Sequence, residues 1–374
     1  MTDTDRDLLP EGLEDQLPRE AAAATRIMRA AVDAMDAHGY DRVIPPLIEF
    51  EKSLAGRMAG VQSRRMFRFV DPLSLRMMAL RNDITAQVGR IAATGLANAP
   101  RPLRLCYAGQ VVIIKGDGLD PARERLQIGA ELIGSDSVEA AGEIVSLAIE
   151  ALRAAGATGI SVDFTLPDLV DRLAEGALPL DPAQVDLVRR ELDAKDAGGL
   201  KAAGGEAYLP LLYATGAFEA AAAKLEQLGA GEVLAGRIAG LRQIAARIGG
   251  QARITLDPTE RHGFEYQSWF GFTLYAEGVR GALGRGGTYR ILGASAADGE
   301  PATGFSLYPD LLVSAALGDD RLRDTLFLPL GHDAETAARL RAIGWRTIAA
   351  LSDGDDPVPL GCTHVLRGVE PVKI

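Results

Sequence analysis

The stretch RPLRLCYAGQVVIIKGDGLDPARERLQIGAELIG, Arg101 to Gly134, decides the fold. It predicts a strand over Leu103–Val112, a long polar loop, and a second strand over Leu126–Leu132 that runs back beside the first. Because side chains alternate between the faces of a strand, Gln127 and Glu131 share one face. Burying polar groups alone is costly, so they need a polar partner or ligand. A polar pocket is therefore predicted; a solvated edge strand, disfavoured by the apolar neighbours, is the alternative.

Composition indicates a globular protein with one large and one smaller domain. The 374 residues suffice for a large core, and 47% hydrophobic and 24% charged residues are ordinary values. The net charge of −11 argues against a nucleic-acid partner, because neutralising phosphates requires a basic surface. The sequence shows no signal peptide and no long apolar run, and its two cysteines fit a reducing compartment. We therefore expect a cytoplasmic protein without a membrane segment.

Periodicity and turn residues predict the order of elements. Helices are expected over about Pro18–His38, Asp83–Ala93 and Val138–Ala155. The prolines of DRVIPPLIEF, Asp41–Phe50, exclude a central strand and favour an edge or an interface. We expect a first core part, a helical insertion, a second core part and a short C-terminal α/β segment, over residues 1–167, 168–250, 251–320 and 321–374.

Four segments together resemble the catalytic core of class II aminoacyl-tRNA synthetases, and histidyl-tRNA synthetases in particular. They are the hairpin quoted above, LRND of Leu80–Asp83, ERHGFEYQSWFGFTLY of Glu260–Tyr275, and GRGGTYRIL of Gly284–Leu292. The resemblance implies an α/β (α+β) fold in which a mixed, mainly antiparallel sheet is flanked by helices. It also implies a homodimer contact at the proline segment, Asp41–Phe50.

The resemblance implies a histidine-type binding pocket. In histidyl synthetases an L-R-P-E-x-T-A segment, a Q-x-x-G-x-E segment and a V-R-G-L-D-Y-Y-T-G motif line that pocket. The corresponding positions here are Asp83, Thr85, Gln127, Glu131, His262 and Tyr266. His262 stands where the motif has its arginine, and Trp269 replaces a glycine and could fill part of the pocket. For Asp83 a helix N-cap is an equally good explanation.

Two arginines that clamp ATP in the synthetases are missing. Aligned without a gap from Arg104, the pattern R-L-x-Y-x-G-x-x-F-R places the first arginine on Ile113. The second, in a G-x-G-x-E-R-type pattern, falls near Asp310 or Leu311. Neither isoleucine, aspartate nor leucine can supply the permanent charge and planar donor fork of a guanidinium. We therefore expect no adenylate formation and no catalytic residue.

A synthetase fold without these arginines resembles the regulatory subunits of ATP phosphoribosyltransferase, which act in the first step of histidine biosynthesis. It implies a non-catalytic subunit with the short-form catalytic chain as its partner and L-histidine as the ligand of feedback. An active histidyl-tRNA synthetase and a stand-alone class II-like amino-acid-binding paralogue stay open as alternatives. No P-loop, Rossmann glycine pattern or metal-ligand spacing occurs, so we expect no cofactor and no metal.

Overall fold

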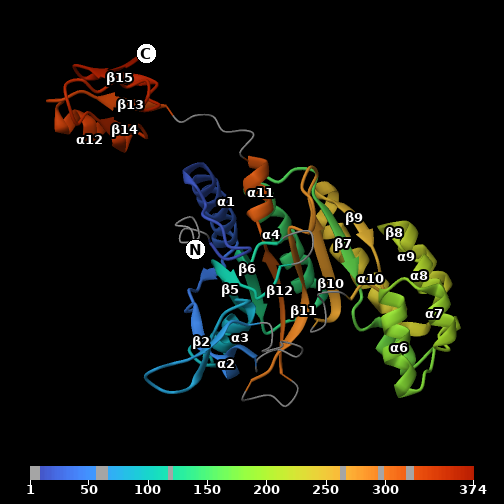
Figure 1. Ribbon diagram of the computed structural model, residues 1–374. Helices are drawn as coiled ribbons and strands as arrows, with labels where there is room; N and C mark the ends of the chain where they lie inside the picture. Colours follow the sequence, from blue (N-terminus) through green and yellow to red (C-terminus); the bar gives the residue numbers. More distant parts are fainter. Residues whose placement is uncertain (1–8, 56–65, 117–120, 262–266, 294–298, 317–323) are drawn as a thin grey trace, which may run out of the picture. The chain divides into compact units, whose positions relative to one another are not determined.

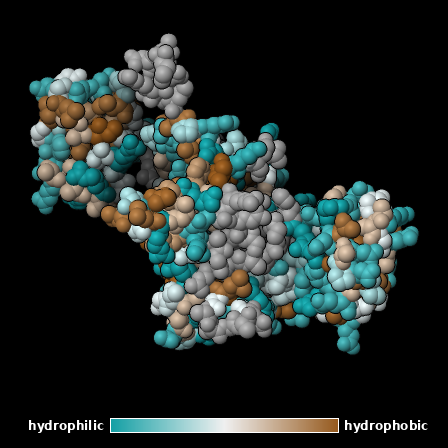
Figure 2. Space-filling view, turned by 60° about the horizontal axis from the view of Figure 1, so that its bottom comes forward, coloured by the Kyte–Doolittle hydropathy of each residue, from teal (hydrophilic) through white to brown (hydrophobic). Residues whose placement is uncertain are grey.

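The computed structural model describes residues 9–55, 66–116, 121–261, 267–293, 299–316 and 324–374 (Figure 1). The chain divides into two compact units, Met1–Leu317 and Gly318–Ile374. Within the described residues, no helix is long and apolar enough to cross a membrane. The face shown in Figure 2 is largely hydrophilic with scattered hydrophobic groups, in keeping with the 24% of charged residues.

A nine-stranded sheet forms the centre of the first unit. In spatial order its strands are β1 (Asp41–Arg42), β5 (Leu103–Val112), β6 (Glu124–Ile133), β12 (Glu300–Leu307), β11 (Gly284–Ile291), β10 (Gln267–Tyr275), β7 (Ser161–Thr165), β9 (Arg253–Leu256) and β8 (Gly216–Ala217). The pairs β1–β5 and β7–β9 are parallel and the others antiparallel, which confirms the predicted mixed sheet. Because β6 lies between β5 and β12, the alternative of a solvated edge strand is wrong.

Long helices cover one face of this sheet (Figure 1). They are α1 (Pro18–Ala37), α4 (Val138–Ala154), α10 (Gly231–Ile248) and the shorter α11 (Asp310–Ala316). The predicted helix ends are confirmed for α1, after which Gly39 has a φ of 77°, and for α4, where the Ser137 side chain accepts from the Ala140 amide. On the opposite face lies α3 (Thr85–Ala93), which packs with Leu105 and Tyr107 of β5.

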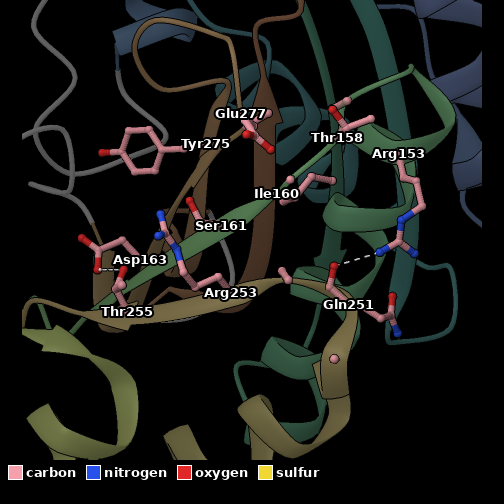
Figure 3. Close-up of a pocket in the computed structure, with 15 residues that line it drawn as sticks. Arg153, Thr158, Ile160, Ser161, Asp163, Gln251, Arg253, Thr255, Tyr275 and Glu277 are labelled. Carbon is pink, nitrogen blue, oxygen red and sulfur yellow. Dashed lines mark hydrogen bonds between the residues drawn. The ribbon is translucent and has the colours of Figure 1, made fainter.

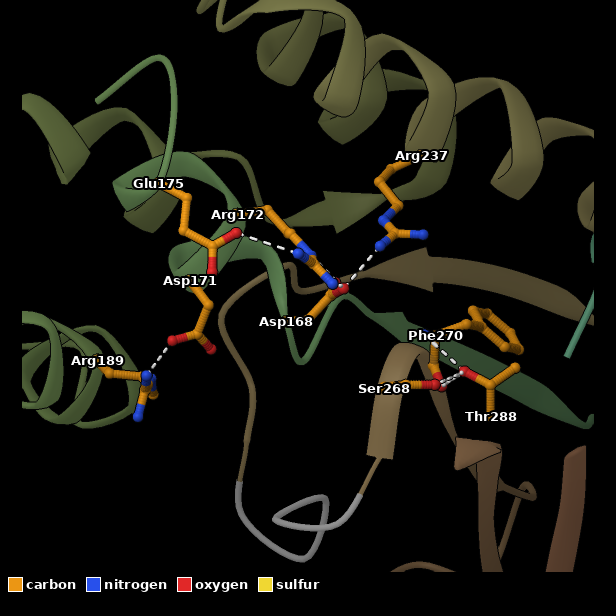
Figure 4. A network of polar contacts seen from close by, with 9 residues as sticks. All are labelled: Asp168, Asp171, Arg172, Glu175, Arg189, Arg237, Ser268, Phe270 and Thr288. Atoms are coloured by element: carbon orange, nitrogen blue, oxygen red, sulfur yellow. Dashed lines mark hydrogen bonds and ion pairs between the residues drawn. The ribbon is translucent and has the colours of Figure 1, made fainter. Parts of the chain in front are cut away.

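The segment expected to be an insertion is mainly helical. It contains α5 (Leu169–Ala174), α6 (Pro182–Asp193), α7 (Ala197–Ala202), η3 (Glu206–Tyr208), α8 (Leu209–Tyr213), α9 (Phe218–Gln227), α10, and η4 (Gly249–Gln251). Figure 4 shows one contact within it: Arg237 of α10 donates to Asp168, which directly precedes α5, at 2.6 Å. The same guanidinium lies 5.3 Å from the ring centre of Trp269 on β10. The cation–π contact therefore links α10 to the sheet, and the ion pair links α10 to the start of α5.

The proline segment lies at the edges of two sheets. β1 ends the nine-stranded sheet, and β2 (Ile48–Phe50) ends a small sheet in the order β2, β4 (Met77–Leu80), β3 (Arg68–Val70), with α2 (Glu51–Ala55) after β2. The expected edge position of Pro45 and Pro46, between β1 and β2, is confirmed. β3 and β4 pair antiparallel as a hairpin.

The C-terminal unit is a small α/β structure. Its four-stranded sheet has the order β14 (Arg346–Ala349), β13 (Thr325–Leu328), β15 (His364–Arg367) and β16 (Glu370–Lys373), and α12 is Ala334–Ala342. Leu326 and Leu328 of β13 pack with Ala337 and Leu340 of α12, giving this unit a core of its own. The Asp333 side chain accepts from the Thr336 amide and so caps α12.

Candidate functional site

Alternation along β5 separates a helix-covered face of the sheet from an open face. Arg104 pairs with Glu143 of α4 at 2.7 Å, so the even-numbered residues of β5 face that helix. Tyr107 has the opposite parity and points to the other face, where it meets Glu131 of β6. The residues predicted for the pocket lie on this second face, as the alternation of β6 predicted.

Glu131 is the most buried carboxyl group of the site, with 1% of its surface exposed. The Tyr289 hydroxyl of β11 donates to its Oε2 at 2.6 Å, and the Tyr107 hydroxyl donates to its Oε1 at 3.1 Å. Burial raises the pKa of Glu131 to about 8, with Asp83 adding to the rise and the hydrogen bond from Tyr289 opposing it. Near neutral pH this carboxyl group is therefore mostly protonated.

Hydroxyl and amide groups close a network around Glu131. The Tyr107 hydroxyl lies 3.0 Å from the hydroxyls of both Thr85 and Ser306. Gln127 donates through Nε2 to Ser306 Oγ at 2.8 Å and accepts through Oε1 from the Ile84 amide at 2.9 Å. We call this set the Glu131 cluster; its members are Asp83, Thr85, Tyr107, Gln127, Glu131, Tyr289 and Ser306.

Asp83 lies beside the start of α3 and belongs to the Glu131 cluster, but the N-cap of α3 is Ile84 and not Asp83 as the sequence suggested. Its Oδ1 accepts from the Thr85 amide at 2.7 Å, which satisfies a backbone donor in the first turn of α3. The same oxygen accepts from Gln127 Nε2 at 3.1 Å and so belongs to the cluster. One carboxylate oxygen of Asp83 therefore links the first turn of α3 to Gln127 on β6.

The Glu131 cluster leaves almost no free space. The cavity lined by Thr85, Glu131, Gln267, Tyr289 and their neighbours has a volume of about 10 Å³. A buried water needs roughly 10–15 Å³, so the described residues leave room here for at most one water. The polar groups instead form hydrogen bonds with one another, and these bonds offset the cost of removing the groups from water. That cost was the reason for predicting a pocket.

The remaining predicted pocket positions are only partly described. His262 and Tyr266 lie outside the described residues. Gln267, the first residue of β10, lines the small cavity, and its Oε1 is buried with no hydrogen-bond partner in the described structure. The expectation that Trp269 fills the pocket is wrong: its indole lies in the main core and donates to the Asp136 carbonyl at 2.7 Å.

A β-bulge explains the position of Trp269. The pairing of β10 with β11 shifts register between Gln267 and Gly271, so simple alternation fails over these residues. Thr288 of β11 fits into the bulge: its hydroxyl accepts from the Phe270 amide at 3.2 Å and from the Ser268 hydroxyl at 2.9 Å (Figure 4). Thr288 therefore has a structural role.

Neither position of the missing ATP clamps carries a cation. Ile113 follows β5 and continues the hairpin, donating its amide to the Arg123 carbonyl at 2.8 Å. Asp310 opens α11 and accepts from the Leu126 amide at 3.1 Å. Leu311 packs against the main core. Among the described residues, no group of three or more His, Cys, Asp or Glu could hold a metal ion.

The sequence pointed to Asp83, Thr85, Gln127 and Glu131, and the structure brings all four together. It also adds Tyr107, Tyr289 and Ser306, which sequence reasoning had not assigned to the site. Alternation placed Tyr107 on the face opposite Arg104, so this residue could have been found. Tyr289 and Ser306 became neighbours only through the pairing of β11 and β12 with β6.

Comparison with known proteins places this chain in a family. The histidyl-tRNA synthetase family model matches residues 12–312. The ATP phosphoribosyltransferase regulatory subunits of Rhodospirillum centenum and Paramagnetospirillum magneticum are 42% and 41% identical, each over 96% of this chain and 95% and 96% of their own lengths.

Two solved structures share the fold. One is an ATP phosphoribosyltransferase regulatory subunit/histidyl-tRNA synthetase from Bacillus halodurans, with a TM-score of 0.82, 24% identity, and coverage of 96% of this chain and 97% of that one. The other is a histidyl-tRNA synthetase from Nostoc sp. PCC 7120, with a TM-score of 0.78, 16% identity, and coverage of 96% and 90%. The fold is that of the synthetases, and by its close relatives this chain belongs to the family of ATP phosphoribosyltransferase regulatory subunits.

Proposed function

We propose that this chain is a non-catalytic regulatory subunit that binds and activates a separate, short-form catalytic chain of ATP phosphoribosyltransferase, in the first step of histidine biosynthesis. The identity of 42% and 41% to regulatory subunits over nearly the whole chain supports it. The observation that carries the non-catalytic role is the replacement of both clamp arginines, at Ile113 and at Asp310–Leu311. A histidyl-tRNA synthetase needs those charges to bind ATP, so the family likeness alone does not favour that alternative.

Reconstitution tests the regulatory role. The chain is mixed with a short-form catalytic chain, and phosphoribosyl transfer is measured with and without histidine. We expect the catalytic chain to be more active in the mixture than alone. A catalytic chain whose activity is the same with and without this protein would contradict the proposal.

Pyrophosphate exchange tests the absence of synthetase chemistry. Each missing donor to a developing charge costs roughly 2.7–4 kcal/mol in the transition state, so the loss of two should leave no useful rate. We expect no histidine-dependent exchange of pyrophosphate into ATP. Exchange at the rate of an active synthetase would contradict the non-catalytic role argued from Ile113 and the Asp310–Leu311 region.

Histidine binding belongs to the proposal in a limited form. The residues Asp83, Thr85, Gln127 and Glu131, with His262 and Tyr266, occupy the positions of the synthetase pocket. The cavity of about 10 Å³ and the missing carboxylate-binding arginine support weak or absent binding to the isolated chain, with feedback arising in the complex. Calorimetry decides this point: tight binding to the lone chain that Glu131→Ala leaves unchanged would place the site elsewhere.

A homodimer core is also proposed, formed by α1 and the proline segment. Ile44 and Leu47 flank the two prolines and are 79% and 43% exposed, which supports an apolar contact between identical edges. We expect a dimer by light scattering, and a monomer both alone and with the partner would contradict it. The net charge of −11 supports a complex without nucleic acid, and the two free cysteines support a cytoplasmic location.

A further inference from the structure

The open face of the nine-stranded sheet also carries a cleft, apart from the Glu131 cluster. A cleft of about 1050 Å³ lies where β7 and β9 begin and β10 ends (Figure 3). No residue of the Glu131 cluster lines it. The residues of interest are Ser161, Asp163, Arg253, Thr255 and Tyr275, and we call this site the Arg253 cleft.

Strand register arranges these side chains in two rows. Tyr275 of β10 is paired with Ser161 of β7, which is paired with Arg253 of β9. In the next row on the same face, Asp163 of β7 is paired with Thr255 of β9. Adjacent strands lie about 4.8 Å apart, so the backbones of Tyr275 and Arg253 are roughly 10 Å apart, with Ser161 between them and Asp163 in the next row.

The groups of the cleft differ in charge and are accessible. Arg253 is exposed, and within the described part of the chain its guanidinium has no hydrogen bond or ion pair. Asp163 is half-buried and accepts from the Thr255 hydroxyl at 2.7 Å. Tyr275 is 38% exposed. Figure 3 shows Ser161, Asp163, Arg253 and Tyr275 on the same side of β7.

We propose that the Arg253 cleft binds a nucleoside monophosphate. The exposed ring of Tyr275 offers a stacking surface for a base, and the Asp163 carboxyl group accepts from ribose hydroxyls. The Arg253 guanidinium, with the Ser161 hydroxyl beside it, binds the phosphate. The groups for base and phosphate stand at the two ends of one row, and the carboxyl group for the ribose lies in the neighbouring row.

Volume and charge favour this class of ligand over smaller ones. Ligand sites of drug-sized molecules measure about 300–1,000 Å³, so the cleft suits a nucleotide and is far too large for a free amino acid or an inorganic ion. The charged residues that line the cleft are Arg153, Arg253, Asp163 and Glu277, two of each sign. In a chain with a net charge of −11, such a balanced surface is comparatively favourable for an anion that also carries hydrogen-bond donors.

The test uses the full chain alone, so its outcome is independent of the proposed activation of a catalytic subunit. Binding of AMP, adenosine, ribose 5-phosphate and inorganic phosphate is measured by calorimetry for the wild type and for Arg253→Gln and Tyr275→Leu. Arg367→Gln, which removes an exposed arginine from β15, is the matched control for lost charge. Glu131→Gln tests whether AMP binds in the closed cluster instead.

We expect AMP to bind the wild type, and Arg253→Gln to weaken AMP and ribose 5-phosphate at least tenfold while leaving adenosine unchanged. Tyr275→Leu should weaken AMP and adenosine and spare ribose 5-phosphate. Arg367→Gln and Glu131→Gln should bind AMP as the wild type does. Three results would overturn the proposal: no binding of AMP at millimolar concentration, inorganic phosphate binding as tightly as AMP, or equal losses in Arg253→Gln and Arg367→Gln.

Discussion

The Glu131 cluster and the Arg253 cleft lie on the same face of one sheet, yet one is closed and the other open. Their cavities measure about 10 Å³ and about 1050 Å³. Strand register joins them in one row of paired residues, running from the cleft to the cluster through Thr255, Asp163, Thr273, Arg285, Ser306, Gly129 and Tyr107. The difference lies in what covers the row: α3 lies over the cluster, whereas the described residues leave the cleft uncovered.

The same kinds of side chain have different roles in the closed Glu131 cluster and in the open Arg253 cleft. In the Glu131 cluster, tyrosine hydroxyls and a carboxyl group are bound to one another and contribute to stability. In the cleft, a tyrosine, a carboxyl group and a guanidinium remain accessible and contribute little to folding. A substitution in the cluster should therefore change the free energy of unfolding, and its counterpart in the cleft should not.

The largest effect is expected for a pair of glycines. A methyl group at Gly304 of β12 would collide with the Glu131 carboxylate and lie 2.9 Å from the Ala130 carbonyl. At Gly250, which lines the cleft and has a φ of −79°, the added carbon would meet nothing within 4 Å. We expect Gly304→Ala to lower the free energy of unfolding by about 3 kcal/mol, and Gly250→Ala to change it by less than about 0.5 kcal/mol.

Urea unfolding of the two variants measures this difference. Equal stabilities would mean that β12 or Glu131 can move aside at little cost, so the cluster would be adaptable and not tightly packed. That outcome would also reopen the possibility of a ligand entering beside Glu131.

The second comparison concerns pH. Because burial raises the pKa of Glu131 to about 8, the folded protein keeps a proton that the unfolded chain loses above its ordinary pKa. This contribution to stability is complete below about pH 4.5 and is lost as the pH rises through about 8. Glu131→Gln has no such proton, so we expect its stability relative to the wild type to improve by a few kcal/mol between pH 5 and pH 8.

Asp163 is the matched carboxyl group of the cleft. Burial raises its pKa as well, so the sign is the same, but it is only half-buried and water screens it. Asp163→Asn should therefore show the same trend with a smaller slope. Urea titrations at several pH values give both slopes, and a flat difference for Glu131→Gln would mean that Glu131 is ionised in the folded protein.

Local sequence patterns predicted those strands and helices whose ends depend on their own residues. The bounds of β5 were predicted without error, and those of α1 to within one residue. Alternation also placed Gln127 and Glu131 on one face. Trp269 was placed in the pocket by its position in the synthetase motif, but a bulge in β10 shifts the register there, and bulges leave little trace in a sequence.

The closure of the site could not be predicted, because it depends on which strands become neighbours. Tyr289 and Ser306 are far from Glu131 in the sequence, and their hydroxyls reach the cluster only through the order β6–β12–β11. The proposed roles of His262 and Tyr266 remain predictions, since both lie outside the described residues. The cleft was not foreseen either: Ser161 and Arg253 are ordinary surface residues until β7 and β9 pair.

The smallest expected effect on stability comes from removing one tyrosine hydroxyl group. It compares the cluster with the cleft most directly, because each site has such a group. Tyr107→Phe removes one oxygen that serves Glu131, Thr85 and Ser306, and it leaves those buried groups short of a partner. Unsatisfied buried groups cost about 1–3 kcal/mol, so we expect a loss in that range. Tyr275→Phe removes the same atom from an exposed position and should change stability by less than about 0.5 kcal/mol. Chemical unfolding at pH 6, where Glu131 is mostly protonated, measures both changes. If Tyr275→Phe lost as much free energy of unfolding as Tyr107→Phe, the side chains of the Arg253 cleft would be as tightly hydrogen-bonded as those of the cluster.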